Sequence, residues 1–155
     1  QVKSDSQKWQ PNDKWVELEF EFLAADPFFY SSGESQGENI QSVLYNFPVV
    51  QDGNIHVYPV ITFNFNSGTT TDPIIENTTT GDSITISGDY GTGDEIIIDC
   101  ENMKVELNGV SDFSIVNDDF LLYNFVLQPG TNDLEFRCEN SADLTLEIAW
   151  QNKWI

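Results

Sequence analysis

The chain has 155 residues, enough for one domain whose hydrophobic core folds without metal or disulfide staples. Its 26 acidic and 6 basic side chains give a net charge of −20, and no Lys or Arg lies between Lys14 and Lys104. Because phosphate groups and anionic lipids are bound by clustered cations, this composition argues against a nucleic-acid partner and a membrane partner.

The first predicted element is a half-buried strand over residues 15–22, where apolar residues alternate with glutamates. It follows a polar arm and ends at Asp26-Pro27, after which residues 28–30 are all aromatic. We interpret this change as a seam between two structural units. The predicted division is an N-terminal arm and seam strand over residues 1–26 and a β-sandwich domain over residues 27–155.

Residues 31–39 are rich in Ser, Gly and Glu, a composition that predicts a loop. Residues 43–50 and 55–65 then read as strands on either side of the Asp52-Gly53-Asn54 turn. Because proline cannot donate to a strand ladder, Pro48 and Pro59 predict sheet edges, strand starts or bulges.

The pattern from Gly81 onward is regular. Apolar residues alternate over 84–86, 103–107, 134–138 and 144–150, and Asn108-Gly109 is a strong signal for a tight hairpin. No segment has the 3.6-residue period of a helix. Short strands separated by Gly, Pro and Asn turns predict an all-β fold, an antiparallel β-sandwich or jelly roll, with less than about 10% helix.

Two cysteines, Cys100 and Cys138, each fall in a predicted strand. We interpret them as small buried hydrophobes, with a disulfide between adjacent strands as the alternative. One His and two Cys cannot close a tetrahedral zinc site, so no zinc is expected.

Paired carboxylates are the natural place to look for acid–base catalysis in so acidic a chain. The adjacent pairs are Asp94 with Glu95 and Asp118 with Asp119, but neighbours on a strand point to opposite faces. His56, the one histidine, has no nucleophile motif around it and is expected at the surface or packed. The sequence therefore offers no catalytic residue, and we expect that the protein is not an enzyme.

Acidic side chains near Gly-rich turns raise the question of calcium, which binds six to eight oxygens; they are Asp82, Asp89, Asp94 and Asp99. Asp also populates ordinary turns, and acidic side chains keep exposed β-structure soluble, so we expect no metal and no other cofactor. A basic partner or bound cations are the alternative explanation of the charge. Asn77-Thr78-Thr79 matches the glycosylation pattern, which we interpret as chance.

Four tryptophans lie near the two ends of the sequence: Trp9, Trp15, Trp150 and Trp154. We expect them in the core or where the termini pack. The alternative is an interaction surface, including a platform on which sugars stack.

Several segments together resemble the phage distal tail protein family. The segments are residues 14–20 and 25–30 at the seam, followed by 58–63, 82–86, 95–100, 105–109 and 125–132. The resemblance runs from about Trp15 to the end of the chain. The order and spacing of the segments carry it, since each motif alone is a common β or turn pattern.

The resemblance implies a two-domain protein at the tail tip of long-tailed phages. Its N-terminal domain forms a hexameric ring between tail tube and tail tip. Its C-terminal galectin-like domain projects outward and docks adhesion or other baseplate proteins. Residues 1–26 would then be a remnant of the ring domain, and we expect this fragment to be a monomer although the full-length protein is hexameric. The expected location is the virion, after assembly in the bacterial cytoplasm.

A galectin-like fold does not bring sugar binding with it. True galectins use a His, Asn, Arg, Trp, Glu and Arg set that has no counterpart here, since Arg137 is the one arginine in the chain. The alternative function is a carbohydrate-binding module that recognises host cell-wall polysaccharide. Partner-binding residues are not identified by the sequence.

Overall fold

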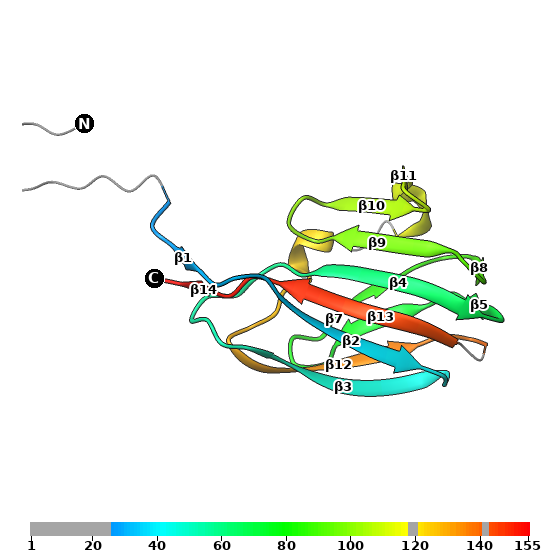
Figure 1. Ribbon diagram of the computed structural model, residues 1–155, viewed down its shortest axis with the longest axis horizontal. Helices are drawn as coiled ribbons and strands as arrows, with labels where there is room; N and C mark the ends of the chain where they lie inside the picture. Colours follow the sequence, from blue (N-terminus) through cyan, green and yellow to red (C-terminus); the bar gives the residue numbers. More distant parts are fainter. Residues whose placement is uncertain (1–25, 118–120, 141–142) are drawn as a thin grey trace, which may run out of the picture.

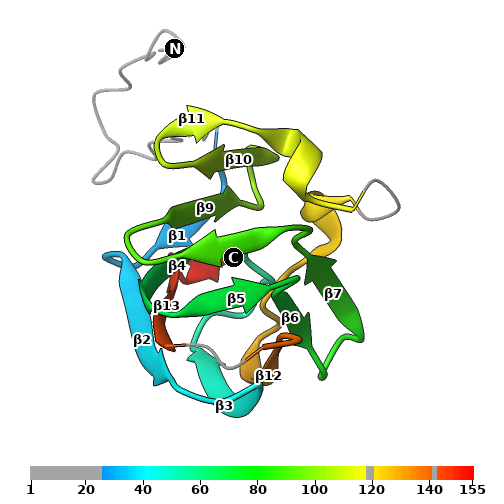
Figure 2. The ribbon, with the colours of Figure 1, turned by 90° about the vertical axis from the view of Figure 1, so that its right-hand side faces the viewer.

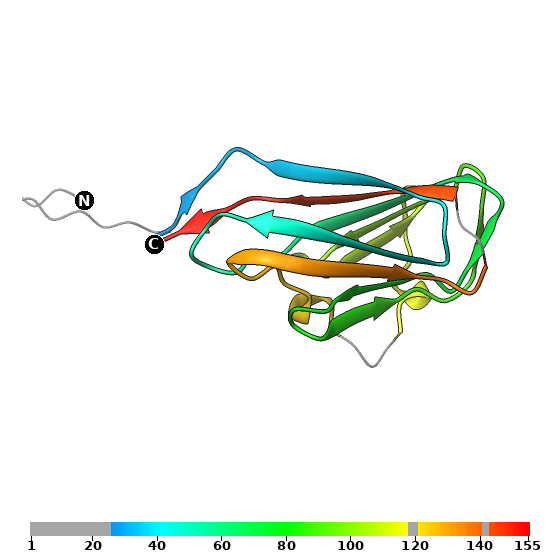
Figure 3. The same ribbon diagram turned by 90° about the horizontal axis from the view of Figure 1, so that it is seen from below.

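The structure is a computed structural model that describes residues 26–117, 121–140 and 143–155. Two antiparallel sheets face each other as the layers of a sandwich (Figures 2 and 3). The larger sheet has the order β11 (Val110–Ser111), β10 (Lys104–Leu107), β9 (Glu95–Asp99), β4 (Val60–Ser67), β13 (Asp143–Trp150) and β2 (Glu34–Ile40). The smaller has the order β3 (Leu44–Gln51), β12 (Gly130–Arg137), β6 (Ile74–Asn77) and β7 (Asp82–Thr85).

Two short ribbons complete the fold at opposite ends of the sandwich (Figure 1). One pairs β1 (Phe29–Tyr30) with β14 (Lys153–Trp154), and the other pairs β5 (Thr69–Thr71) with β8 (Asp89–Gly91). The helices of the described residues are two 3-10 turns of three residues each, η1 (Phe113–Ile115) and η2 (Leu122–Asn124). The predicted all-β antiparallel sandwich with little helix is therefore confirmed, and no described helix is long and apolar enough to cross a membrane.

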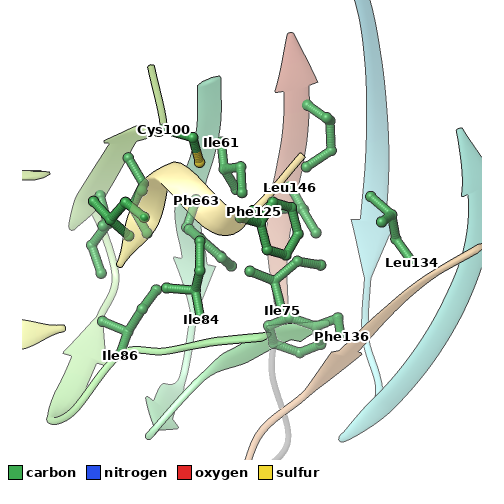
Figure 4. Close-up of a cluster of buried hydrophobic side chains, with 14 of the residues drawn as sticks. Ile61, Phe63, Ile75, Ile84, Ile86, Cys100, Phe125, Leu134, Phe136 and Leu146 are labelled. Atoms are coloured by element: carbon green, nitrogen blue, oxygen red, sulfur yellow. The ribbon is translucent and has the colours of Figure 1, made fainter. Parts of the chain in front are cut away.

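The core fills the space between the two sheets because alternate residues of each strand point inward. Phe63 of β4 and Phe136 of β12 come from opposite sheets, are both fully buried, and have ring centres 6.4 Å apart. Ile75, Ile84 and Leu146 surround this contact (Figure 4). Each such side chain contributes about 1.5–3 kcal/mol of transfer free energy when it is fully buried.

The prediction of a loop over residues 31–39 is wrong, because β2 spans Glu34–Ile40 and pairs with β13 over seven residues. β2 is an edge strand, so most of its side chains face solvent and its composition is polar. Two of its polar side chains close the open edge of the sandwich. Glu38 accepts a hydrogen bond from the Tyr45 hydroxyl at 2.9 Å, and Gln36 donates to the Pro48 carbonyl at 3.0 Å.

The strand predicted over residues 55–65 is only partly correct. β4 begins at Val60, and the residues before it make single bridges, Ile55 with Lys153 and Val57 with Leu127. The reason is that the chain crosses here from the four-stranded to the six-stranded sheet, so it cannot continue one ladder. The prolines behave as predicted, since Pro48 lies in the edge strand β3 and Pro59 immediately precedes β4.

The Asn108-Gly109 hairpin between β10 and β11 is confirmed, with both residues at positive φ (53° and 75°). Both cysteines are free thiols. Cys100 directly follows β9 and Cys138 directly follows β12, so they extend strands of different sheets rather than adjacent strands. Burial raises the pKa of the Cys100 thiol to about 12, which makes it an inert core residue.

Candidate functional site

The β1–β14 ribbon lies at the end of the sandwich where β13 ends and β4, β7 and β12 begin (Figure 1). Phe29 pairs with Trp154 and Tyr30 with Lys153. The Lys153 ammonium group lies over two rings, 5.0 Å from the centre of Phe28 and 5.3 Å from that of Tyr30. Phe29 is 72% exposed, so the ribbon presents a large apolar side chain to its surroundings.

Asn152 joins this ribbon to the body of the sandwich. Its buried side-chain oxygen accepts hydrogen bonds from the Trp150 indole at 3.0 Å and from the Asp52 backbone N–H at 3.2 Å. Gly53 packs directly on β14, since a Cβ added there would lie 2.3 Å from the Lys153 carbonyl oxygen. The ribbon is therefore held on the sandwich by the hydrogen bonds of the Asn152 side chain and by the close contact between Gly53 and β14.

A second feature of this end is a shallow pocket of about 410 Å³ beside β7. It is assembled from the crossover before β4, the start of β7 and the segment before β12. The lining residues are His56, Tyr58, Asp82, Tyr123, Asn124, Val126 and Gln128. We call this feature the tyrosine pocket.

Three aromatic rings form one wall of the tyrosine pocket. Tyr58 and Tyr123 stack with ring centres 4.5 Å apart and an angle of 27° between the planes. The His56 ring meets Tyr58 edge-on at 87°, and its Nε2 lies 3.3 Å from the Tyr58 hydroxyl. Burial and a hydrogen bond with Tyr123 raise the pKa of Tyr58 to about 12, so its phenol stays neutral at physiological pH. Tyr123 is nevertheless 51% exposed.

The buried pair Asn77 and Asn132 fixes the segment that carries Tyr123 and Gln128. Asn77 Nδ2 donates to the Val126 carbonyl at 2.9 Å and to Asn132 Oδ1 at 3.1 Å. Asn132 also accepts from the Gln128 N–H and donates to the Gln128 and Gly130 carbonyls. The buried, hydrogen-bonded amide of Asn77 leaves it inaccessible as a glycosylation acceptor.

The acidic residues considered for calcium do not gather into one site. Asp94 accepts hydrogen bonds from the Asn108 amide at 2.9 Å and the Gly91 N–H at 2.8 Å, which lower the pKa of its carboxyl. Asp99 likewise accepts two bonds from Asn102 at the next turn. Within the described ranges, no group of three or more His, Cys, Asp or Glu residues could hold a metal ion. These carboxylates act as turn caps.

Three cations lie in the described part of the chain, and each is engaged by the protein itself. Lys104 pairs with Glu106 at 2.8 Å, and Arg137 contacts Glu76 and Glu135 on the outer face of β12. Lys153 lies over the rings of Phe28 and Tyr30. Arg137 is on an outer strand face and does not line the tyrosine pocket, so the pocket is no galectin-type sugar site.

The other residues singled out by the sequence divide between core and undescribed segments. Trp150 is buried, as expected, and Trp154 is half-buried in β14. Trp9, Trp15, Asp118 and Asp119 lie outside the described residues. Glu95 begins β9, and its N–H bonds to Asn108, so Asp94 and Glu95 form no facing pair.

Sequence reasoning singled out His56 but missed its neighbours in space. Tyr58 could have been associated with it, because alternate residues of an extended segment share a face. Tyr123 gave no such signal, since it is 65 positions further along and belongs to a short 3-10 turn. Asn152 and Lys153 gave no signal either, since a lone Asn and a lone Lys between two tryptophans match no motif.

Comparison with known proteins identifies the kind of molecule to which this fold belongs. Residues 52–154 match the family described as siphovirus-type tail component, C-terminal domain. The chain therefore belongs to this family of phage tail components, and the resemblance to phage distal tail proteins is confirmed.

One similar solved structure is the crystal structure of the SPP1 Dit (gp 19.1) protein, described as a paradigm of the hub adsorption apparatus in phages that infect Gram-positive bacteria. The TM-score is 0.64 at 14% sequence identity, and the alignment covers 84% of this chain. It covers 50% of the SPP1 Dit chain, so the present chain spans half the length of that protein. No curated protein matches the sequence.

Proposed function

We propose that this chain is the outward-facing module of a phage tail-tip hub, to which adhesion or other baseplate proteins dock. The family match carries the proposal, because it covers most of the sandwich, from residue 52 to residue 154. The similarity of fold to SPP1 Dit, a hub protein, supports it. The function is structural: the module holds other proteins in place and catalyses no reaction.

The proposed division of the chain places the sandwich at residues 27–155 and assigns residues 1–26 to the ring domain of the full-length protein. The β1–β14 ribbon supports this division, since it is small, lies at one end of the sandwich and carries the exposed Phe29. The ribbon is then the end that faces the ring. We expect the full-length protein to form a hexameric ring and this fragment to be monomeric.

Charge supports the monomer, because −20 of net charge opposes contact between copies at low salt. Light scattering coupled to size exclusion should give the mass of one 17.5 kDa chain at low and moderate salt. A stable hexamer of this fragment would overturn the monomer proposal while leaving the tail-tip proposal standing.

The location tests the proposed function itself. The protein is assembled in the bacterial cytoplasm and carried on the virion. Gold-labelled antibodies raised against this chain should mark the tail tip of intact particles in negative-stain electron microscopy. Label on the capsid, along the tail tube or absent from virions would overturn the proposal.

The second candidate function is recognition of host cell-wall polysaccharide. The observation that favours it is the tyrosine pocket, because exposed, stacked aromatic side chains beside amide and carboxylate groups are suited to sugar rings. The two functions are compatible, since no residue of the β1–β14 ribbon lines the pocket.

A further inference from the structure

We propose that the tyrosine pocket binds an uncharged sugar ring, with the outer face of Tyr123 as the stacking surface. The proposal deepens the second candidate function by naming its site and ligand class, and it does not depend on the tail-tip role.

The lining supplies both kinds of contact that a pyranose ring requires. One face of such a ring carries only C–H groups, which pack on a flat aromatic surface, and its rim carries neighbouring hydroxyl groups. Tyr123 is half exposed and braced from behind by Tyr58, so its outer face is a fixed, solvent-facing platform. Planar polar side chains stand around it, with Asp82, Asn124 and Gln128 able to bond pairs of neighbouring hydroxyls.

Charge limits the ligand to uncharged sugars. Asp82 is acidic and no Lys or Arg is among the pocket's described lining residues, in a chain of net charge −20. Phosphate, sulfate or uronate groups would be repelled. Nucleotides would stack on the same rings, but their phosphates meet the same repulsion.

A quaternary ammonium group is the other ligand that aromatic side chains and a carboxylate can attract. Such cations are held where several ring faces surround them. In this pocket one face of Tyr58 and one face of Tyr123 are consumed by their mutual stacking, and His56 meets Tyr58 edge-on. The rings therefore do not enclose a compact cation, whereas the second face of the half-exposed Tyr123 suits a flat sugar ring.

No residue of the ribbon that we assign to the ring lines the pocket, although Ile55, next to His56, bridges Lys153 of β14. The ribbon continues the six-stranded layer beyond the end of β13, whereas β7 belongs to the four-stranded layer and the segment before β12 leads into it (Figure 3). A glycan chain can therefore approach from the side of the four-stranded sheet while the ribbon is covered. The pocket is also pre-formed, because the Asn77–Asn132 bonds hold its Gln128 segment in place.

The test is a titration of the ¹⁵N-labelled 155-residue chain, followed by NMR, with cellotriose, maltotriose and tri-N-acetylchitotriose. We expect at least one of them to bind with a dissociation constant of about 1 mM, as suits a shallow site. Shifts should be confined to residues 56–58, 82 and 121–128. Absence of binding by all three, or shifts elsewhere, would overturn the proposal and leave the gold-labelling result untouched.

Variants distinguish stacking on Tyr123 from non-specific binding to exposed aromatic side chains. Tyr123→Ala should weaken binding about tenfold, whereas Tyr123→Phe keeps the ring face and should bind nearly as the parent does. Phe29→Ala, which removes another exposed aromatic side chain outside the pocket, is the matched control and should leave binding unchanged. Amide spectra show whether each variant is folded. Equal affinity of Tyr123→Ala and the parent would refute the stacking role.

Charged competitors test the choice of ligand class. Glycerol phosphate oligomers and galacturonic acid trimers should bind more weakly than the best neutral sugar at low salt, because Asp82 faces them. Choline should produce no shifts in the pocket. Tighter binding of either anionic probe, or binding of choline without any neutral sugar, would overturn the assignment to uncharged sugars.

Discussion

Replacing Asn132 by Ala tests how the tyrosine pocket is held on the sandwich. Asn132 is fully buried, and its amide makes four hydrogen bonds, two as acceptor and two as donor, at 2.8–3.2 Å. In the variant, water can replace some of the bonds of the exposed Gln128 segment, but the Nδ2 group of Asn77 keeps only its bond to the Val126 carbonyl. We expect the free energy of unfolding to fall by about 2–3 kcal/mol. This value combines a net contribution near 1 kcal/mol per hydrogen bond with the penalty for a poorly satisfied buried amide.

The assay is urea denaturation at pH 7, followed by tryptophan fluorescence and circular dichroism. The midpoint should fall while the slope stays unchanged, because the variant alters stability and not the surface exposed on unfolding. Asp133→Ala is the matched control. Asp133 is the next residue and is exposed, so this variant should change the free energy of unfolding by less than about 0.5 kcal/mol.

Asn132→Asp separates the hydrogen bonds from the lost volume. This variant keeps the shape but places a carboxylate beside the Gln128 and Gly130 carbonyls that the native amide donates to. It should be destabilised at pH 7 and recover stability as pH falls, because protonation removes the buried charge and restores one donor. Equal midpoints for Asn132→Ala and Asp133→Ala would refute the bracing role of the buried amide.

Three further predictions probe the core, the ribbon and the turns. Phe136→Ala should lower the free energy of unfolding by about 3–5 kcal/mol in urea melts, because it leaves a cavity at the centre of the core. Glu135→Ala on the outer face should lower it by less than about 0.5 kcal/mol. Equal losses would mean that the strand faces are misassigned. Gly53→Ala should lower the free energy of unfolding by about 1–3 kcal/mol, because the added Cβ would overlap the backbone of β14. Gly33→Ala is the control, since a Cβ there meets open space. Similar melting temperatures of the two variants would contradict the contact. The hydrogen bonds that lower the pKa of Asp94 stabilise the fold above the ordinary carboxyl pKa. The parent should therefore have a larger free energy of unfolding than Asp94→Asn at neutral pH, and this difference should vanish as pH falls through the lowered pKa. A difference in free energy of unfolding that stays constant from pH 7 to pH 2 would show that the charge is not responsible.

The sequence predicted the class of fold because the buried strands carry strict alternation. In β13 the even positions from Leu144 to Trp150 are all buried, and in β9 Ile96 and Ile98 behave likewise. β2 escaped prediction because only Ile40 in it is fully buried. Its strand conformation comes from its partner β13, and a single-sequence pattern does not contain that partner.

The candidate site was less visible for a topological reason. The tyrosine pocket is built where three separate segments meet, at His56 and Tyr58, at Asp82 and at residues 121–128. Each segment lies before or at the start of a strand, where no periodicity marks which side chains point together. The family resemblance predicted the kind of protein because it depends on the order of many weak motifs. That order is recognisable even though no single motif is specific.

Electron cryomicroscopy of the tail tip on intact virions tests the central claim most directly. We expect this sandwich to be attached to the periphery of a ring at the end of the tail tube, with the β1–β14 ribbon turned toward the ring. The opposite end, which carries β5 and β8, should point outward, and the tyrosine pocket should remain open to solvent. A sandwich found elsewhere on the particle would refute the tail-tip role, and one whose β5–β8 end contacts the ring would refute the proposed orientation.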